Sequence, residues 1–336
     1  MGASLPPQAT FIPVSSEEDI REHIPKTKSF FVLHSPISTE LLTKIAGEHI
    51  LAVFAHHAFA NRRVPDYYKK CNLVLSVSEH MTGILRSNGL TNCYPDPFYG
   101  VVNIARASEI SGNITVGLLY KWDKRKVRDR ILSRLYPMFR KFSPAPIFAK
   151  RPGLTLGIVS RISPIKQFPL LFSIIAPIIK RYPQINIEIF GSGEGYAQVR
   201  EIKKSISIIA NQVRFWGERV DVASIYPQLD FLLTGLPERE ALGLNVIEAQ
   251  FCGTPVIAVD APPFRETVVN NKTGFLYKDP RTDHGQDFGA LLNKIVNSQV
   301  RPNPLLATDH LSKFSFEQFN ERVERLLTYV NRIYLG

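Results

Sequence analysis

The chain has 336 residues, a length typical of two domains. Its 44% of hydrophobic residues fits a soluble protein with sizeable cores, and the absence of any run of roughly 18–20 apolar residues excludes a membrane-spanning helix. The formal net charge of +11 favours a polyanionic partner, such as phospholipid head groups, lipid-linked phosphates or nucleic acid, without choosing among them.

The first half of the chain shows a weak alternation of strands and helices. Apolar runs at Ser29–Leu33, Ile50–Phe54 and Leu73–Val77 predict strands, with helical segments between or after them. We therefore predict a reduced Rossmann-like domain over residues 1–150. It ends in a linker rich in proline and glycine at residues 143–153.

Most of the positive charge lies in residues 121–141, which carry nine Lys/Arg and two Asp/Glu. Apolar residues recur there at helical spacing (Val127, Ile131 and Leu135), so an amphipathic helix with a basic face is predicted. This helix favours peripheral contact with a membrane surface or a lipid phosphate. We expect no specific nucleic acid, because the aromatic platforms of single-strand binders are not arrayed beside it. A plain solvated helix remains an open alternative.

The second half alternates regularly between strands and helices. Strands are predicted at Leu154–Ser160, Ile185–Phe190, Val213–Trp216, Asp230–Thr234, Pro255–Asp260 and Gly274–Tyr277, and helices at Ile165–Arg181, Tyr196–Ala210 and Leu242–Cys252. Such spacing predicts right-handed βαβ units and a doubly wound parallel sheet covered on both faces. Ligands of such a domain bind beyond the carboxyl ends of the strands. We predict this domain over residues 151–312, followed by a helix within residues 313–336.

Two glutamates eight positions apart, Glu240 and Glu248, flank the predicted start of a helix, with Gly243 between them. Amides at a helix N-terminus favour anions, and a carboxylate accepts hydrogen bonds from a vicinal diol. The pair therefore suits a ligand with sugar hydroxyls at both ends and phosphates between them. From spacing alone, a capping glutamate and a solvated helix glutamate explain the pattern equally well.

The same segment resembles the E-x7-E signature of the retaining glycosyltransferases of the GT-B fold, family 4. The matching residues are Glu240, Gly243, Glu248, Ala249, Cys252, Gly253, Pro255 and Val256, and Leu242 stands where an aromatic residue is usual. The resemblance implies two Rossmann-like, doubly wound domains facing across a cleft. Residues 1–150 would bind the acceptor and residues 151–312 the nucleotide-sugar donor, and the last helix would return to the first domain.

The resemblance also implies roles for single residues. Glu240 would contact hydroxyls of the donor sugar and Glu248 the ribose diol, with Leu242, Gly243 and Leu244 beside them. Arg161 and Lys166, which follow the first strand of the donor domain, would bind the diphosphate and stabilise it as it leaves. Two fixed cations can do this without a metal, so metal-independent transfer is expected. For an isolated Arg and Lys, surface solubility is the alternative.

Further matches to the family follow two other strands. Gly193, within Gly191–Gly195, matches the glycine turn after the second strand, although a strand-to-helix turn commonly needs glycine. The turn is not a full dinucleotide fingerprint, so a nicotinamide cofactor is rejected. Trp216 and Gly217 resemble the strand end that lines the nucleobase pocket, and a buried core tryptophan is the alternative for Trp216.

The first half resembles the family less closely. His56 is the best counterpart of the family's histidine near the acceptor, and His34 is the second. A partly buried structural histidine is the alternative for each. The glycine-rich loop that usually follows the first strand is missing from residues 1–16, so the N-terminal domain is predicted to be shortened.

These observations predict a glycosyltransferase of the hexosyltransferase type (EC 2.4) that acts with retention in surface glycan, lipopolysaccharide or glycolipid synthesis. The donor would be a UDP- or GDP-linked sugar, with no other cofactor, and the acceptor a glycan or a lipid-linked hydroxyl. Alternatives are a nucleotide-sugar epimerase or phosphorylase on the same fold, and a non-enzymatic basic adaptor for membranes or nucleic acid. The three isolated cysteines and the lack of a secretory signal predict a cytoplasmic protein, peripheral to the membrane's inner face.

Overall fold

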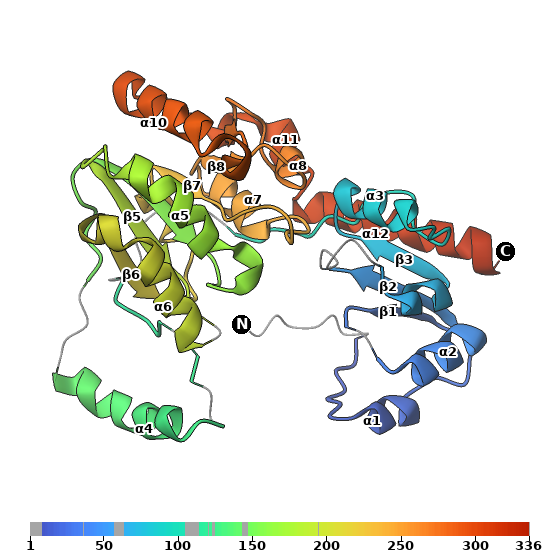
Figure 1. The fold of residues 1–336 in the computed structure, drawn as a ribbon. Coiled ribbons are helices and arrows are strands. Elements are labelled where there is room, and N and C mark those ends of the chain that lie inside the picture. The colour runs from blue at the N-terminus through green and yellow to red at the C-terminus, as the bar shows by residue number, and fades with distance from the viewer. Residues whose placement is uncertain are drawn as a thin grey trace. The chain divides into compact units, whose positions relative to one another are not determined.

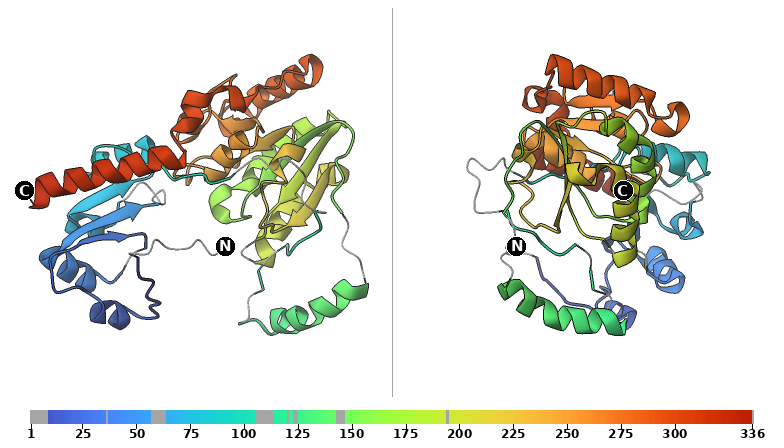
Figure 2. Two further views of the ribbon diagram at one scale, coloured as in Figure 1. Left: turned by 180° about the vertical axis from the view of Figure 1, so that it is seen from behind. Right: turned by 60° about the vertical axis from the view of Figure 1, so that its left-hand side comes forward.

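The computed structural model describes residues 9–35, 37–56, 64–104, 114–119, 121–122, 125–142, 147–193 and 195–335. The chain folds as two compact units (Figures 1 and 2). Unit 1 comprises Met1–Phe98 and Tyr329–Gly336, and unit 2 comprises Tyr99–Thr328. The boundary predicted at residues 150 and 151 lies inside unit 2, and residues 143–146 of the predicted linker lie outside the described residues.

Unit 1 contains a parallel sheet of three strands in the order β1-β2-β3. The strands are β1 (Phe30–Leu33), β2 (Ile50–Ala55) and β3 (Leu73–Ser76), and the helices are α1 (Glu17–Glu22), α2 (Thr39–Glu48), η2 (Asp66–Lys70) and α3 (Glu79–Ser87). Every residue of the central strand β2 is buried, as expected for a parallel strand covered on both faces. All three strands were predicted from their apolar runs. Among the described residues, the three strands lie in the sheet in the same order as in the chain, so the strand order does not reverse.

The C-terminal residues complete unit 1. Helix α12 (Phe316–Val330) begins in unit 2, ends in unit 1, and continues as the π-helix η7 (Asn331–Leu335). The ring of Tyr329 lies edge-on to that of Tyr94, with centroids 5.3 Å apart. The Tyr334 hydroxyl donates a 2.6 Å hydrogen bond to the carbonyl of Asn72. These contacts attach the end of the chain to the same unit as the β1–β3 sheet.

Unit 2 is built on a parallel sheet of six strands in the order β6-β5-β4-β7-β8-β9 (Figure 1). The strands are β4 (Leu154–Val159), β5 (Ile185–Phe190), β6 (Val213–Gly217), β7 (Phe231–Leu233), β8 (Val256–Val259) and β9 (Gly274–Tyr277). This is the strand order of a doubly wound Rossmann sheet. The order reverses between β4 and β7, which are paired in the middle of the sheet. Loops leaving these two strands diverge, and the crevice between them is where such domains bind ligands.

Helices cover both faces of this sheet, so each face has its own hydrophobic core. The helices of unit 2, not all of which pack on the sheet, are α4 (Val127–Phe142), η3 (Pro164–Lys166), α5 (Phe168–Ile179), α6 (Tyr196–Ser205), η4 (Ser207–Gln212), η5 (Tyr226–Gln228), α7 (Leu244–Phe251), α8 (Phe264–Thr267), α9 (Pro280–Asp283), α10 (Gln286–Ser298), η6 (Pro304–Leu306) and α11 (Thr308–Ser312). One core joins α5, α6 and α10 to the sheet, and the other joins α7 and η5 to it. The predicted α/β fold with parallel sheets is thereby confirmed.

The predicted basic helix is α4, which belongs to unit 2 and begins at Val127 rather than at residue 121. Residues 123 and 124 of the basic segment lie outside the described residues. The side chains of Val127, Ile131 and Leu135 are 60%, 54% and 38% exposed. The helix thus presents an uncovered apolar stripe among its arginines. In the part of the chain that the structure describes, no helix is both long and apolar enough to span a membrane.

Candidate functional site

The central feature of unit 2 is an ion pair between Lys166 and Glu240. The Nζ atom of Lys166 donates a hydrogen bond to Oε2 of Glu240. Their side chains are 19% and 15% exposed, so the pair is largely shielded and still reachable from solvent. Lys166 ends η3, which follows β4, and Glu240 lies in the loop that follows β7. The pair therefore lies at the point where the strand order reverses.

A glycine brings these two loops together. A Cβ atom at Gly235 would lie 2.2 Å from the carbonyl oxygen of Lys166, so no larger residue could occupy that position without moving the backbone. The amide of Leu236 donates a 3.2 Å hydrogen bond to the same carbonyl. The loop after β7 is thus fixed against the loop after β4, and the lysine and the carboxylate meet as a consequence.

A cavity of about 190 Å³ lies at the carboxyl ends of β4, β5 and β6. Arg161 lines it from the end of β4, Ser192 from the end of β5, and Glu218 and Arg219 from the end of β6. Glu248 lines it from α7. The Glu218 carboxylate accepts a 2.8 Å hydrogen bond from the Ser192 hydroxyl, and the buried Nε of Arg219 has no hydrogen-bond partner among the described residues. Two arginines and two glutamates thus line a small cavity, together with apolar residues such as Val159 and Phe190.

Glu248 is held by a buried tyrosine. The hydroxyl of Tyr226 donates a 2.8 Å hydrogen bond to Oε2 of Glu248, and Tyr226 is fully buried in the core beneath the cavity. Burial, followed by the charge of Glu248, raises the pKa of Tyr226 far above its ordinary value, so the hydroxyl remains a donor at neutral pH. This bond leaves the other carboxylate oxygen, Oε1, available to a ligand.

The helix that carries Glu248 begins beside β4. Gly243 is the N-cap of α7 and has a φ of +87°, a left-handed conformation that favours glycine. The side chain of Asn245 donates a 3.1 Å hydrogen bond to the carbonyl of Val159 at the end of β4. Leu242 is buried, whereas Leu244 is 44% exposed. The N-terminus of α7 thus lies at the same edge of the sheet as Arg161.

The structure places Trp216 in the hydrophobic core. Its side chain is 3% exposed, and its Nε1 donates a 2.6 Å hydrogen bond to the buried carboxylate of Glu188 on β5. Arg214 lies over the indole ring, 5.0 Å from its centroid. Gly193, by contrast, lies in the turn after β5, and Gly217 is the last residue of β6; their chain neighbours Ser192 and Glu218 line the cavity.

His56 belongs to unit 1, where it follows β2. His34 follows β1, and a 2.9 Å hydrogen bond joins its Nδ1 to Nε2 of His56. The two rings are stacked with Phe54, with His34 and Phe54 centroids 4.6 Å apart. His34 is exposed and His56 half-buried, so the two candidates for one role form a single pair at the carboxyl ends of neighbouring parallel strands.

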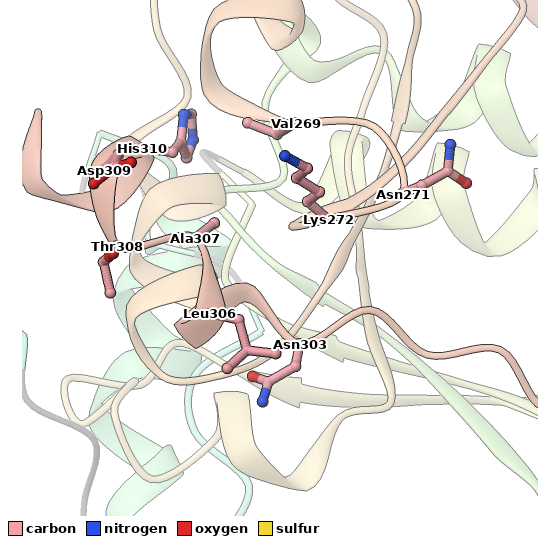
Figure 3. A pocket seen from close by; sticks show the side chains of 9 residues that line it. All are labelled: Val269, Asn271, Lys272, Asn303, Leu306, Ala307, Thr308, Asp309 and His310. Carbon is pink, nitrogen blue, oxygen red and sulfur yellow. The ribbon is translucent and has the colours of Figure 1, made fainter.

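Two larger cavities of unit 2 lie at the amino ends of strands. Figure 3 shows one of about 490 Å³, lined by the turn Val269–Lys272 before β9 and by residues 303–310. Its His310 is buried and donates a 3.1 Å hydrogen bond from Nε2 to the carbonyl of Thr267, and burial lowers the pKa of its ring. The other, about 430 Å³, is lined by the starts of β4 and β7. Because doubly wound sheets bind ligands at carboxyl ends, the smaller cavity beside Arg161 is the better candidate.

No metal site accompanies these groups in the described ranges: they contain no cluster of three or more His, Cys, Asp or Glu side chains able to hold a metal ion.

Comparison with known proteins finds similarity in the part of the chain that carries this site. Residues 141–305 match the family model Glycosyl transferases group 1. The match includes Arg161, Lys166, Glu240 and Glu248. This part of the chain, which contains the E-x7-E segment, is thus similar to the group 1 glycosyltransferases.

Two curated proteins similar to this chain are named as sugar transferases. D-inositol 3-phosphate glycosyltransferase of Rhodococcus erythropolis is 32% identical over 198 residues, which are 55% of this chain and 43% of the relative. Phosphatidyl-myo-inositol mannosyltransferase of Mycolicibacterium smegmatis is 24% identical over 196 residues, 56% of this chain and 49% of the relative. The match to this chain therefore spans less than half the length of these curated relatives.

Among solved structures, Anabaena HepE in complex with UDP and glucose aligns with a TM-score of 0.60 and 18% identity, over 87% of this chain and 76% of that one. At this identity the likeness concerns the fold. It confirms that the chain shares the α/β fold with parallel sheets of GT-B glycosyltransferases.

Several residues around the group 1 site were not predicted from the sequence. Tyr226 has no motif around it, and only the fold brings it beneath Glu248. Glu218 and Arg219 follow the predicted strand Val213–Trp216 after one glycine, so their position at a carboxyl end was the signal that could have identified them.

Proposed function

We propose that this protein is a glycosyltransferase of the hexosyltransferase type that transfers a sugar from a nucleoside-diphosphate sugar to an acceptor hydroxyl. The observation that carries the proposal is the Lys166–Glu240 pair at the reversal of the strand order, beside a cavity lined by Arg161 and Glu248. The group 1 domain over residues 141–305 and its glycosyltransferase relatives support it.

The proposed donor site assigns one part of the donor to each charged group. Glu248 accepts hydrogen bonds from the ribose diol, and Arg161 and Lys166 face the diphosphate. Glu240 orients the sugar hydroxyls, and the turns at Gly193 and Gly217 lie along the nucleotide. As the bond between the anomeric carbon and the diphosphate breaks, charge grows on the leaving oxygen, and the two cations offset it without a metal. The proposed donor is a UDP- or GDP-linked sugar.

Transfer is proposed to retain the configuration, as in family 4. The acceptor hydroxyl attacks the anomeric carbon from the face that the diphosphate leaves, and its proton passes to the departing diphosphate. On unit 1, the His34–His56 pair is proposed to contact the acceptor, and the exposed ring of His34 offers the free nitrogen. The acceptor class is a glycan or a lipid-linked hydroxyl, in surface glycan, lipopolysaccharide or glycolipid synthesis.

A thermal-shift panel of UDP, GDP, ADP and their sugars tests this proposal. We expect one nucleotide family to raise the Tm, because a ligand that binds only the folded state stabilises it by mass action. At 100 times its Kd, a nucleotide should add about 2.7 kcal/mol to the free energy of unfolding. A Tm unchanged across the whole panel would contradict the proposal and favour a non-enzymatic adaptor.

Helix α4 is proposed to contact an anionic membrane surface on the cytoplasmic side. Its apolar stripe of Val127, Ile131 and Leu135 is exposed, and Arg130 and Arg134 on the same helix are exposed as well. An amphipathic helix with these properties lies in the membrane interface, where each basic residue near an anionic surface contributes about 1 kcal/mol.

Charge reversal tests this contact. The double variant Arg130→Glu and Arg134→Glu should weaken binding to phosphatidylglycerol vesicles at least about 30-fold, measured by flotation. The matched control, Lys180→Glu with Lys204→Glu, changes the net charge equally at exposed positions elsewhere in unit 2 and should bind like the wild type. Equal loss in both variants would mean that overall charge, not α4, attracts the vesicles.

A further inference from the structure

A segment of the chain lies across the ends of β5 and β6 and uses their main-chain hydrogen-bonding groups. We call this segment, Ile114–Leu119 together with Lys121, the strap. The amide of Gly117 donates a 2.6 Å bond to the carbonyl of Trp216, and the amide of Glu218 donates a 2.9 Å bond to the carbonyl of Leu118. The amide of Gly193 donates to Leu119 and its carbonyl accepts from Lys121, each over 2.9 Å.

Two glycines allow the strap to lie this close. A Cβ atom at Gly117 would be 2.2 Å from the carbonyl oxygen of Glu218, and one at Gly217 would be 2.5 Å from the carbonyl of Gly117. The strap is anchored at its start, where Ile114 is buried in the same core as Trp216. Farther along, the side chain of Leu118 is 37% exposed, and backbone hydrogen bonds hold the strap in place.

The strap occupies groups that the proposed donor site needs. Gly193 and Gly217 lie in the two turns along the nucleotide, and the amide of Gly193 is already bonded to Leu119. An amide has one hydrogen to donate, so Gly193 cannot bind a phosphate while the strap is in place. The cavity beside the strap measures about 190 Å³, below the roughly 300–1,000 Å³ of ligand pockets.

We propose that the strap is an autoinhibitory element that the nucleotide part of the donor must displace. The proposal rests on the proposed glycosyltransferase function, since it concerns the same donor site. With the strap bound, only the fraction of molecules in which it has left is competent to bind, and the apparent affinity falls by that fraction.

A single substitution tests the proposal. Gly117→Val places a side chain against the backbone of Glu218 and should expel the strap without altering any residue assigned to the donor. We expect calorimetry to show that Gly117→Val binds UDP or GDP about tenfold more tightly than the wild type. The matched control, Leu118→Ala, shortens an exposed side chain of the strap, keeps its backbone bonds, and should match the wild type. An unchanged or weaker affinity in Gly117→Val would overturn the proposal.

Amide hydrogen exchange of the wild-type protein provides a readout that needs no variant. With saturating UDP or GDP, the amides of Gly117 and Lys121 should exchange about tenfold faster, because they lose the carbonyls of Trp216 and Gly193. Unchanged or slower exchange at both amides would overturn the strap proposal while leaving the proposed function intact. If no nucleotide binds any of the three proteins, including Gly117→Val, the proposed function itself fails and the strap proposal with it.

Discussion

Substitution of Lys166 by alanine is expected to lower the rate of donor cleavage about 10²–10³-fold, the effect typical of losing one fixed group that stabilises developing charge. Lys166 is fixed in position by its hydrogen bond to Glu240 and by the loop contact at Gly235. In the proposed function, a cation held in this way would offset the charge of the departing diphosphate without having to reorganise. The rate is measured as nucleoside diphosphate released from the donor with water as acceptor, so the acceptor need not be known.

The control for this variant is Lys180→Ala, an exposed lysine at the end of α5. It should retain full activity and the wild-type Tm. Lys166→Ala should also remain folded, because Glu240 is 15% exposed and water can solvate the carboxylate that loses its partner. A folded Lys166→Ala variant with a rate within threefold of the wild type would contradict the role assigned to this lysine.

Much of the fold could be predicted because the pattern of apolar residues along the sequence indicates its strands and helices. The predicted bounds of β5 and β9, Ile185–Phe190 and Gly274–Tyr277, are the observed ones, because large apolar residues recur through both segments; β5 also carries the buried Asn186 and Glu188. The basic helix was predicted six residues too long at its start. Its apolar spacing begins only at Val127, whereas the positive charge begins at residue 121, and charge alone does not define a helix.

The candidate site was only partly predictable. Residues at the ends of strands, such as Arg161 and Lys166, could be placed at one edge of the sheet, because parallel strands share a carboxyl edge. The position of Trp216 could not be decided, since an indole at a strand end suits both a nucleobase and a core. The decision depends on Glu188 of the neighbouring strand, which accepts its hydrogen bond. The strap was missed because its hydrogen bonds to the ends of β5 and β6 are between backbones and leave no side-chain pattern.

The glutamate pair is local in the sequence, but the contacts that orient the two carboxylates are not. Glu240 and Glu248 are eight residues apart in sequence, yet their bonded partners, Lys166 and Tyr226, are 74 and 22 residues away. Each partner fixes one carboxylate oxygen, so each glutamate has one oxygen left to meet a ligand. The two carboxylates are therefore oriented by the fold before any donor binds, an arrangement that reduces the entropy lost on binding.

Removal of the Glu248 carboxylate should have its largest effect on the affinity for the nucleotide. Glu248→Ala is expected to raise the Kd of the preferred nucleoside diphosphate about 10²–10⁴-fold, because hydrogen bonds to a charged group contribute about 1.5–3 kcal/mol each and the ribose offers two. Tyr226→Phe removes only the bond that orients the carboxylate, so we expect a smaller rise of about 3–10-fold. The control Glu201→Ala, an exposed glutamate on α6, should leave the Kd unchanged.

A double-mutant cycle in which the second change is made in the ligand tests whether Glu248 contacts the ribose. If Glu248 binds the ribose diol, the 2′,3′-dideoxy nucleotide has already lost the same hydrogen bonds, and Glu248→Ala should change its Kd less than about threefold. The losses from the mutation and from the deoxygenation are then far from additive, as expected for two groups in direct contact. Additive losses would instead place Glu248 away from the ribose, and the cavity lined by Arg161 and Arg219 would have to hold another part of the donor.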